Sequence, residues 1–174
     1  MTPTRVLLAA PRLVGALLVT LMATVLVITV LPGQAGAVQV RSQAAVAAYP
    51  AMSTSTYEKD VQRWINVQRD KRGLRHLQLA SCTDRVAERW GSYLAAHDAF
   101  YHQSMDAILK ECRARYAGET LGRGAISPRR LVRMWMNSPS HRKILLSKQP
   151  RRVGIGAYPD VYGQWVVAAD FMRF

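Results

Sequence analysis

With 174 residues, the chain has room for one globular domain and little more, which excludes a large multidomain architecture. Apolar residues make up 49% of the sequence, and part of them stand in one N-terminal block. The 24 Lys and Arg residues outnumber the 11 Asp and Glu residues, which gives a net charge of +13. We therefore expect a leader, a short linker and one basic globular unit.

The N-terminal block has the three parts of a secretory signal. Arg5 and Arg12 precede an uncharged apolar run, residues 13–31, and Ala35-Gly36-Ala37 fits the small-x-small pattern of a signal-peptidase site. The apolar run has 19 residues, which at about 1.5 Å per residue nearly spans a bilayer core. We therefore predict a signal peptide, or an uncleaved membrane anchor, over residues 1–37, with the rest of the chain exported.

The segment that follows, residues 38–55, is rich in Ala, Ser, Thr, Gln and Val and carries little charge. This composition is typical of a flexible linker. The globular domain is then predicted over residues 56–174. Ser55 and Glu58 have the spacing of a capping box, which predicts the start of the first helix, and Gly73 is predicted to end it.

Apolar residues at helical spacing predict four helices in the domain. The second helix is expected over about residues 81–96. Ser127 and Ser138 are each followed by proline, a combination that favours the start of a helix, and they mark the third and fourth. A further short helix is expected at about residues 105–111.

The end of the chain changes to the period of β-strands. Residues 152–158 and 164–172 read as two strands, and the turn residues at 159–163 join them into a β-hairpin. Residues 116–124 contain three glycines and are expected as a turn-rich segment beside a possible short strand. Because strands do not alternate with helices, the fold class is α+β rather than parallel α/β.

The chain has two cysteines, Cys82 and Cys112. An even count in an exported protein favours one disulfide, and two buried free thiols are the alternative. A disulfide would close a loop of about 30 residues and stabilise the fold by roughly 3 kcal/mol.

Several common catalytic signatures are absent from the sequence: HExxH, CxxC, GxSxG, the P-loop and the dinucleotide fingerprint. What remains is an ordered set of five segments: Phe100-Tyr101-His102, AGETLGRG at residues 117–124, WMNSPSHR at residues 135–142, VGIG at residues 153–156, and residues 165–171. In this order and spacing they resemble the CAP superfamily of cysteine-rich secretory, antigen 5 and pathogenesis-related 1 proteins, in its bacterial branch.

This resemblance implies an α-β-α sandwich, with about four helices packed on a small antiparallel sheet that ends in the C-terminal β-hairpin. It also implies a cleft that gathers His102, Glu119, Ser138 and His141. Many members of the superfamily carry glutamate where this chain has Ser138. Thr120 stands where the family usually has Asn, and because its hydroxyl can bond its own backbone, only a modest local effect is expected.

The chemistry of these four side chains favours binding over catalysis. Two neutral imidazoles and a carboxylate are a reasonable zinc set, with His102 and His141 as the metal ligands. Ser138 in place of a second carboxylate removes one strong ligand and leaves a bound water without a good general base. Zinc is therefore the one cofactor we consider, and no residue is assigned a catalytic role.

Two competing interpretations concern single residues. Ser138 is the expected N-cap of the fourth helix, which would engage its oxygen with backbone amides and oppose a role as a nucleophile for His141. His76 and His97 are expected to be structural or solvated. The four tryptophans are expected to fill the core or the cleft wall, and the pairs Arg129-Arg130 and Arg151-Arg152 to be solvated, or an anion-binding patch if they cluster.

The resulting hypothesis is a non-enzymatic extracellular binding module, secreted or membrane-tethered, that acts at the cell envelope on a small apolar ligand or a metal. A metal-assisted hydrolase of peptide or cell-wall substrate is the alternative, and a ligand-free spacer is a third. Residues 38–174 carry a net charge of +11, which favours anionic envelope polymers or lipid as partners. No nucleic-acid partner is expected, because export removes it and no binding motif is present.

Overall fold

The computed structural model describes residues 52–174. The expected signal peptide or anchor at residues 1–37, and most of the expected linker, lie outside the described residues. The described residues belong to one compact unit. None of the helices in this part of the chain combines the length and the apolar character needed to cross a membrane.

Residues 52–174 form five helices, which include the short one expected near residue 105. In chain order they are α1 (Thr54–Asp70), α2 (Ser81–Ala96), α3 (Met105–Cys112), α4 (Pro128–Asn137) and α5 (Pro139–Leu145). Because α1 begins at Thr54, the last two residues of the segment expected as linker belong to this helix.

The N-cap of α1 differs from the prediction. Ser53, not Ser55, accepts the backbone N–H of Thr56 at 3.2 Å. Glu58 is not part of a capping box, because its Oε1 accepts the backbone N–H of Ala157 at 3.0 Å, in a strand far along the chain. This tertiary hydrogen bond replaces the local one that the spacing of Ser55 and Glu58 predicted.

The sheet has four strands in the order β1-β3-β4-β2: β1 (Gln78–Leu79), β2 (Tyr116–Gly124), β3 (Arg152–Pro159) and β4 (Trp165–Arg173). β3 and β4 form the predicted hairpin, and β2 pairs antiparallel with β4. The expected antiparallel sheet also contains one parallel pair, since β1 pairs parallel with β3. Two residues are too few to show an alternating pattern, so the sequence carries no local signal for β1.

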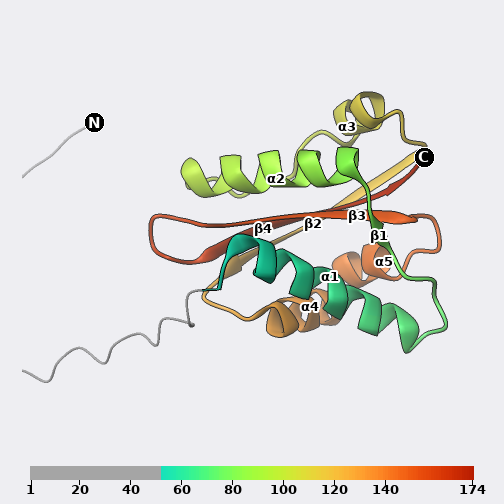
Figure 1. The fold of residues 1–174 in the computed structure, drawn as a ribbon, viewed down its shortest axis with the longest axis horizontal. Helices are drawn as coiled ribbons and strands as arrows, with labels where there is room; N and C mark the ends of the chain where they lie inside the picture. The colour runs from blue at the N-terminus through green and yellow to red at the C-terminus, as the bar shows by residue number, and fades with distance from the viewer. Residues whose placement is uncertain (1–51) are drawn as a thin grey trace, which may run out of the picture. The chain divides into compact units, whose positions relative to one another are not determined.

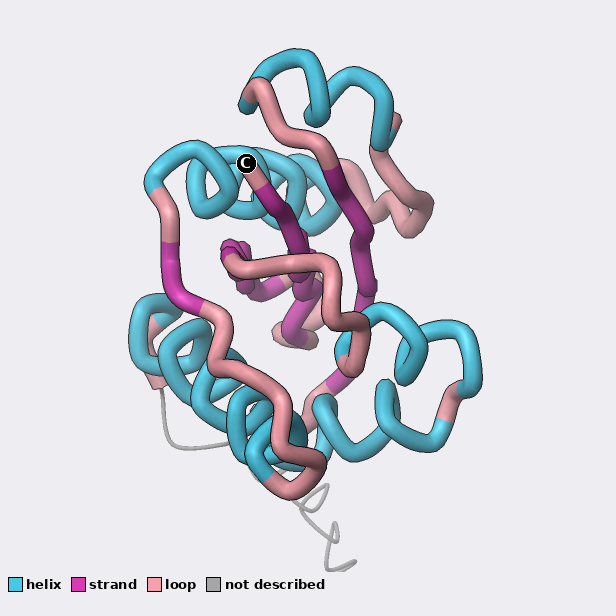
Figure 2. The backbone as a smooth tube through the Cα atoms, turned by 90° about the vertical axis from the view of Figure 1, so that its right-hand side faces the viewer, coloured by secondary structure: helices cyan, strands magenta, loops and turns pink. Residues whose placement is uncertain are grey.

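The domain has three layers, as the α-β-α sandwich requires. α1, α4 and α5 cover one face of the sheet, and α2 and α3 cover the other (Figure 1). The view along the sheet shows the strands between the two groups of helices (Figure 2). In β4, Val167, Ala169 and Phe171 pack in one core, while Val166 and Ala168 pack in another. Both faces of the strand are therefore buried, which explains why its sequence is a nearly continuous apolar run.

The VGIG segment lets α2 lie directly on the sheet. A side chain at Gly154 would collide with the backbone of Thr83, and one at Gly156 with the backbone of Ala87. Gly91 of α2 likewise faces the backbone of Gly156. These glycines are needed for close approach of helix and strand.

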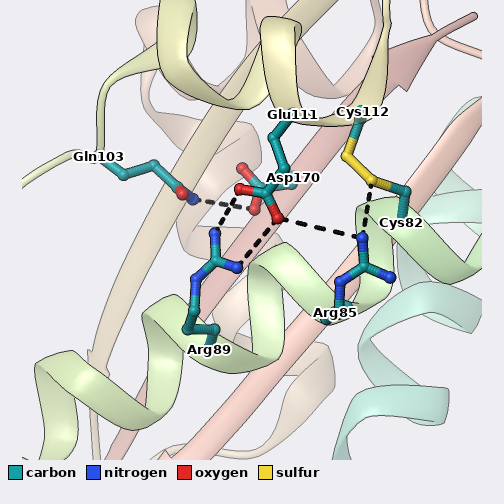
Figure 3. The surroundings of a disulfide bond; sticks show 7 residues. All are labelled: Cys82, Arg85, Arg89, Gln103, Glu111, Cys112 and Asp170. Carbon is teal, nitrogen blue, oxygen red and sulfur yellow. Dashed lines mark hydrogen bonds and ion pairs between the residues drawn. A yellow bond between two sulfur atoms is a disulfide. The ribbon is translucent and has the colours of Figure 1, made fainter.

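The two cysteines form the predicted disulfide. It joins Cys82, in the first turn of α2, to Cys112, the last residue of α3, across a sequence separation of 30 residues (Figure 3). Arg85 lies beside it, with Nη2 at 3.4 Å from the sulfur of Cys82 and 4.0 Å from Glu111 Oε1. The bond fixes both ends of the segment that carries His102.

Candidate functional site

His102 and Glu119 are in direct contact. His102 lies in the loop between α2 and α3, and its Nδ1 is 2.6 Å from Oε1 of Glu119 in β2. The carboxylate is buried, with 1% of the side chain exposed, whereas 58% of the imidazole is exposed. Glu119 thus orients His102 through Nδ1 and leaves Nε2 as the nitrogen available to a ligand.

Glu119 lies opposite a second buried carboxylate, that of Asp170 in β4. Gln103 connects the two. Its amide nitrogen donates to Glu119 Oε2 at 2.8 Å and to Asp170 Oδ2 at 3.0 Å, and its backbone N–H donates to Glu119 Oε1 at 3.3 Å. Gln103 and Asp170 face each other beside α2 in Figure 3.

Burial governs the protonation of this carboxylate pair. It raises the pKa of Glu119, although the hydrogen bonds from Gln103 and His102 oppose the rise. It raises the pKa of Asp170 much further, and the negative charge of Glu119 adds to this effect. Oδ1 of Asp170 has no hydrogen-bond partner among the described residues. The site therefore favours a protonated Asp170 beside an ionised Glu119.

Ser138 and His141 lie at the junction of α4 and α5 and line a cleft of about 600 Å³. The other lining residues come from the loop before His102, from β2, from α4 and from the β3–β4 turn: Phe100, Leu121, Gly122, Arg123, Leu131, Met134, Trp135 and Gln164. Burial lowers the pKa of His141, and the charge of His102 lowers it further. The two histidines therefore share one electrostatic neighbourhood and favour a neutral His141.

The hydroxyl of Ser138 does not cap α5. Ser138 stands at the N-cap position, but its side chain accepts no backbone N–H, and its Oγ is 3.1 Å from Oγ of Ser140. The capping role expected for this oxygen is therefore wrong. Pro139 fixes the first turn of α5 without it, and the oxygen stays available in the wall of the cleft.

The four expected cleft residues form two pairs in the structure. No hydrogen bond in the described part of the chain links His102 or Glu119 to Ser138 or His141. Of the four, Ser138 and His141 line the cleft. His102 and Glu119 form a hydrogen bond between the α2–α3 loop and the edge strand β2. The structure thus gives one hydrogen-bonded pair, in which Glu119 is buried and His102 is exposed, and one pair that lines the cleft.

The arrangement does not fit a zinc centre. Zinc sites in proteins use at least three protein ligands. Within residues 52–174, no group of three or more His, Cys, Asp or Glu side chains is placed to hold a metal ion. Glu119 is also engaged by both His102 and Gln103. Zinc binding by His102 and His141 stays a prediction from the resemblance, and the donor geometry gives it no support.

The family model for the cysteine-rich secretory protein family, CAP, matches residues 62–169. The chain belongs to this family. An uncharacterized protein of Bacillus subtilis, YkwD, is 32% identical over 111 residues, which are 60% of this chain and 43% of that protein. The chain therefore spans less than half the length of this relative.

Several solved structures share the fold. An outer surface protein of Borrelia burgdorferi matches with a TM-score of 0.63 at 23% identity, over 70% of this chain and 96% of that one. A cysteine-rich secretory protein of Staphylococcus aureus matches with a TM-score of 0.61 at 20% identity, over 72% and 40%. An extracellular Bacillus anthracis protein with an SCP domain gives 0.59 at 23%, over 70% and 43%. At these identities the likeness concerns the fold alone.

The sequence did not reveal several residues of the CAP domain that shape the site. Gln103 and Asp170 were not expected to act on Glu119, although both flank or lie in segments of the motif set. Arg123 was also missed: its Nη1 bonds Asp98 Oδ1 at 2.8 Å, and its guanidinium lies 5.6 Å from the ring of Phe100 at the cleft. Their only signal was a position within or directly beside the family segments.

Thr120 departs from the expectation in a different way. It is completely buried, and its hydroxyl has no hydrogen-bond partner among the described residues. The bond to its own backbone that this hydroxyl could make is therefore not formed. The backbone of Thr120 pairs with Ala169 of β4, so the strand holds the residue in place without the help of its side chain.

The remaining histidines lie outside the cleft. His76 is exposed and pairs with Asp70 through Nε2 and Oδ1 at 2.6 Å. His97 stacks on the ring of Tyr93 at the end of α2. Trp135 is the tryptophan that fills both the core and the cleft wall, and its Nε1 donates to the carbonyl of Leu121 at 2.8 Å.

Proposed function

We propose that this chain is an exported, non-enzymatic CAP-domain protein that binds a small amphipathic ligand in the cleft at the α4–α5 junction. The observation that carries this proposal is the cleft of about 600 Å³ with its largely apolar wall. That size lies in the range of small-molecule sites, about 300–1,000 Å³.

The composition of the cleft wall fits an amphipathic ligand. Phe100 and Met134 are exposed by 51% and 48%, although such apolar side chains gain by burial. Ser138, His141 and Arg123 add a few polar groups to the same wall. An apolar surface with few polar groups is typical of sites that bind the body of a ligand by burial and orient one polar end.

Export is part of the proposal. The leader pattern at residues 1–37 supports it, and so does the disulfide between Cys82 and Cys112, because disulfides persist in oxidising compartments. Three of the proteins compared are described as extracellular, outer-surface or secretory proteins. We propose that the domain acts outside the cytoplasm, at the cell envelope.

A metal-assisted hydrolase receives less support. Ser138 provides a hydroxyl where many family members have a carboxylate. Within residues 52–174, the donor groups near His102 and His141 do not supply the three protein ligands of a zinc site. A neutral His141 beside Ser138 resembles a base and nucleophile, but no hydrogen bond between the two is present in the described residues. Binding without catalysis is the simpler use of this geometry.

The test measures binding of an uncharged solvatochromic dye, Nile red, to purified residues 38–174. In the Met134→Glu variant we expect the dye affinity to fall at least tenfold, because a charge is placed in the apolar wall. The control Val161→Glu adds the same charge at a side chain exposed by 77% outside the cleft, and it should change the affinity less than twofold. A zinc-dependent hydrolytic activity lost in His102→Ala/His141→Ala would contradict the non-enzymatic proposal.

A further inference from the structure

A second concavity, of about 390 Å³, lies between the C-terminal part of α1 and the helices α4 and α5. Its lining is dominated by positive charge, because half of the lining residues are cations: Lys71, Arg72, Arg129, Arg133 and Arg142. We call this concavity the cationic pocket. Its other lining residues include Trp64, Val132 and Met136, and none is acidic.

The cations of the pocket are not neutralised by the protein. None of the five takes part in an ion pair within residues 52–174, whereas Arg63, Arg85, Arg89 and Arg123 elsewhere each pair with a carboxylate. Asp70 is next to Lys71 in sequence, but it pairs with His76. Five like charges around one concavity repel one another, and an anion in the pocket would relieve that repulsion.

The helix dipole accounts for the positions of only some of these five cations. Lys71 and Arg72 follow the C-terminal end of α1, where cations are stabilised by the helix dipole. Arg129 stands in the first turn of α4, the end at which the dipole disfavours cations, and that turn contains no acidic residue. The position of Arg129 therefore opposes local stability and favours a bound anion.

Three of the guanidinium groups are held in place. The guanidinium of Arg129 lies 4.9 Å from the ring centroid of Trp64. Arg142 donates from Nη1 to the carbonyl of Met136 at 3.1 Å, and Arg72 donates to the carbonyl of Gln68 at 2.8 Å. Donors that are already positioned lose less side-chain entropy when they bind an anion.

We propose that the cationic pocket binds a phosphate group of a ligand distinct from the one in the cleft. Four of the five cations are arginines, whose planar forked donors match phosphate oxygens in pairs. A phosphate monoester presents nearly two negative charges and three acceptor oxygens, enough for several of these donors at once. The volume leaves room for more than one phosphate or for the group that carries it.

The experiment titrates the full-length chain, in an uncharged detergent and at low salt, with inorganic pyrophosphate by calorimetry. The pocket variant is Lys71→Gln/Arg133→Gln. Both side chains line the pocket and make no hydrogen bond or ion pair within the described residues, so the fold should persist. The matched control is Lys59→Gln/Arg130→Gln, which removes one Lys and one Arg near or on the same helices outside the pocket.

We expect the pocket variant to bind pyrophosphate at least tenfold more weakly than the wild type, and the control to change the affinity less than twofold. Thermal denaturation of all three proteins verifies that each is folded. Equal weakening in both variants, no pyrophosphate binding by the wild type, or equal affinity for citrate would overturn the proposal.

A second pair of titrations identifies the source of the phosphate. Glycerol 3-phosphate represents a free phosphate, and a soluble short-chain phosphatidylglycerol, below its micelle concentration, represents a lipid head group. Tighter binding of either compound supports phosphate binding in the pocket if Lys71→Gln/Arg133→Gln abolishes the difference in affinity. A preference that survives in that variant would overturn the assignment to the pocket.

Discussion

Two carboxylates are buried on neighbouring strands, although Asp and Glu side chains are rarely fully buried. Glu119 of β2 and Asp170 of β4 are directly opposed, and one side-chain amide, that of Gln103, bonds both. Like charges opposite each other in a sheet are destabilising. Protonation of Asp170 removes this repulsion, and Glu119 then keeps the charge that orients His102.

The carboxylate pair makes the stability of the fold depend on pH. Because the pKa of Asp170 is raised in the folded state, folding favours its protonated form. The stability that protonated Asp170 contributes is complete below the ordinary carboxyl pKa of about 3.9. It is lost as the pH rises through the pKa that Asp170 has in the folded state. The raised pKa of Glu119 acts with the same sign.

Asp170→Asn should therefore flatten the decline of stability between pH 4 and pH 8. At pH 8 the variant should be more stable than the wild type, by about 1–3 kcal/mol, because the neutral amide avoids the cost of burying an ionised carboxylate beside Glu119. Chemical denaturation at a series of pH values measures this. Asp106→Asn, at an exposed position, is the control and should leave the pH dependence unchanged. A wild type that gains stability over Asp170→Asn as the pH rises would contradict the prediction.

Among the elements, α3 is the helix that the disulfide ties to the rest of the domain. The bond ties the first turn of α2 to the end of α3, on the face of the sheet that carries Asp170. α3 is short, with eight residues, and only Ile108 and Cys112 of it are buried. The covalent bond therefore supplies much of what holds α3 to the sheet.

Removal of this bond should destabilise the domain. For a loop of this length, Cys82→Ala/Cys112→Ala should cost about 3 kcal/mol of unfolding free energy and lower the melting temperature by several degrees. Reduction of the wild type should give a similar shift, and the double variant should not respond to reductant. Unchanged melting on complete reduction would mean that the bond contributes no stability.

The elements with a strong local signal were predictable, and those set by distant partners were not. Ser127-Pro128 marks the start of α4 correctly, since serine bonds and proline geometry act within one turn. The bond of Glu58 to Ala157 and the two-residue strand β1 depend on strand placement, which no local pattern encodes. The same limit applies to the site, where Asp170 meets Glu119 only through the register of β2 and β4.

At the scale of the whole molecule, α4 separates two concavities of different character. Met134 and Trp135 contribute to the apolar cleft, while Arg129 and Arg133 contribute to the cationic pocket. Side chains one turn apart on a helix lie on the same face. One helix can therefore present an apolar face to the cleft and a cationic face to the pocket. The two proposed ligands, one in the cleft and one in the cationic pocket, would therefore bind on different faces of α4.

The disulfide has a consequence for how the domain withstands cleavage. Residues 82–112 form a closed covalent ring, and the exposed residues Tyr101 and His102 lie on it. Exposed loops are where proteases cut first. A single cut beside His102 would open the ring without releasing either fragment, so the clipped protein should migrate as one chain on a gel without reductant and as two with it. In the exported protein that we propose, one cut in this loop would leave the domain in one piece.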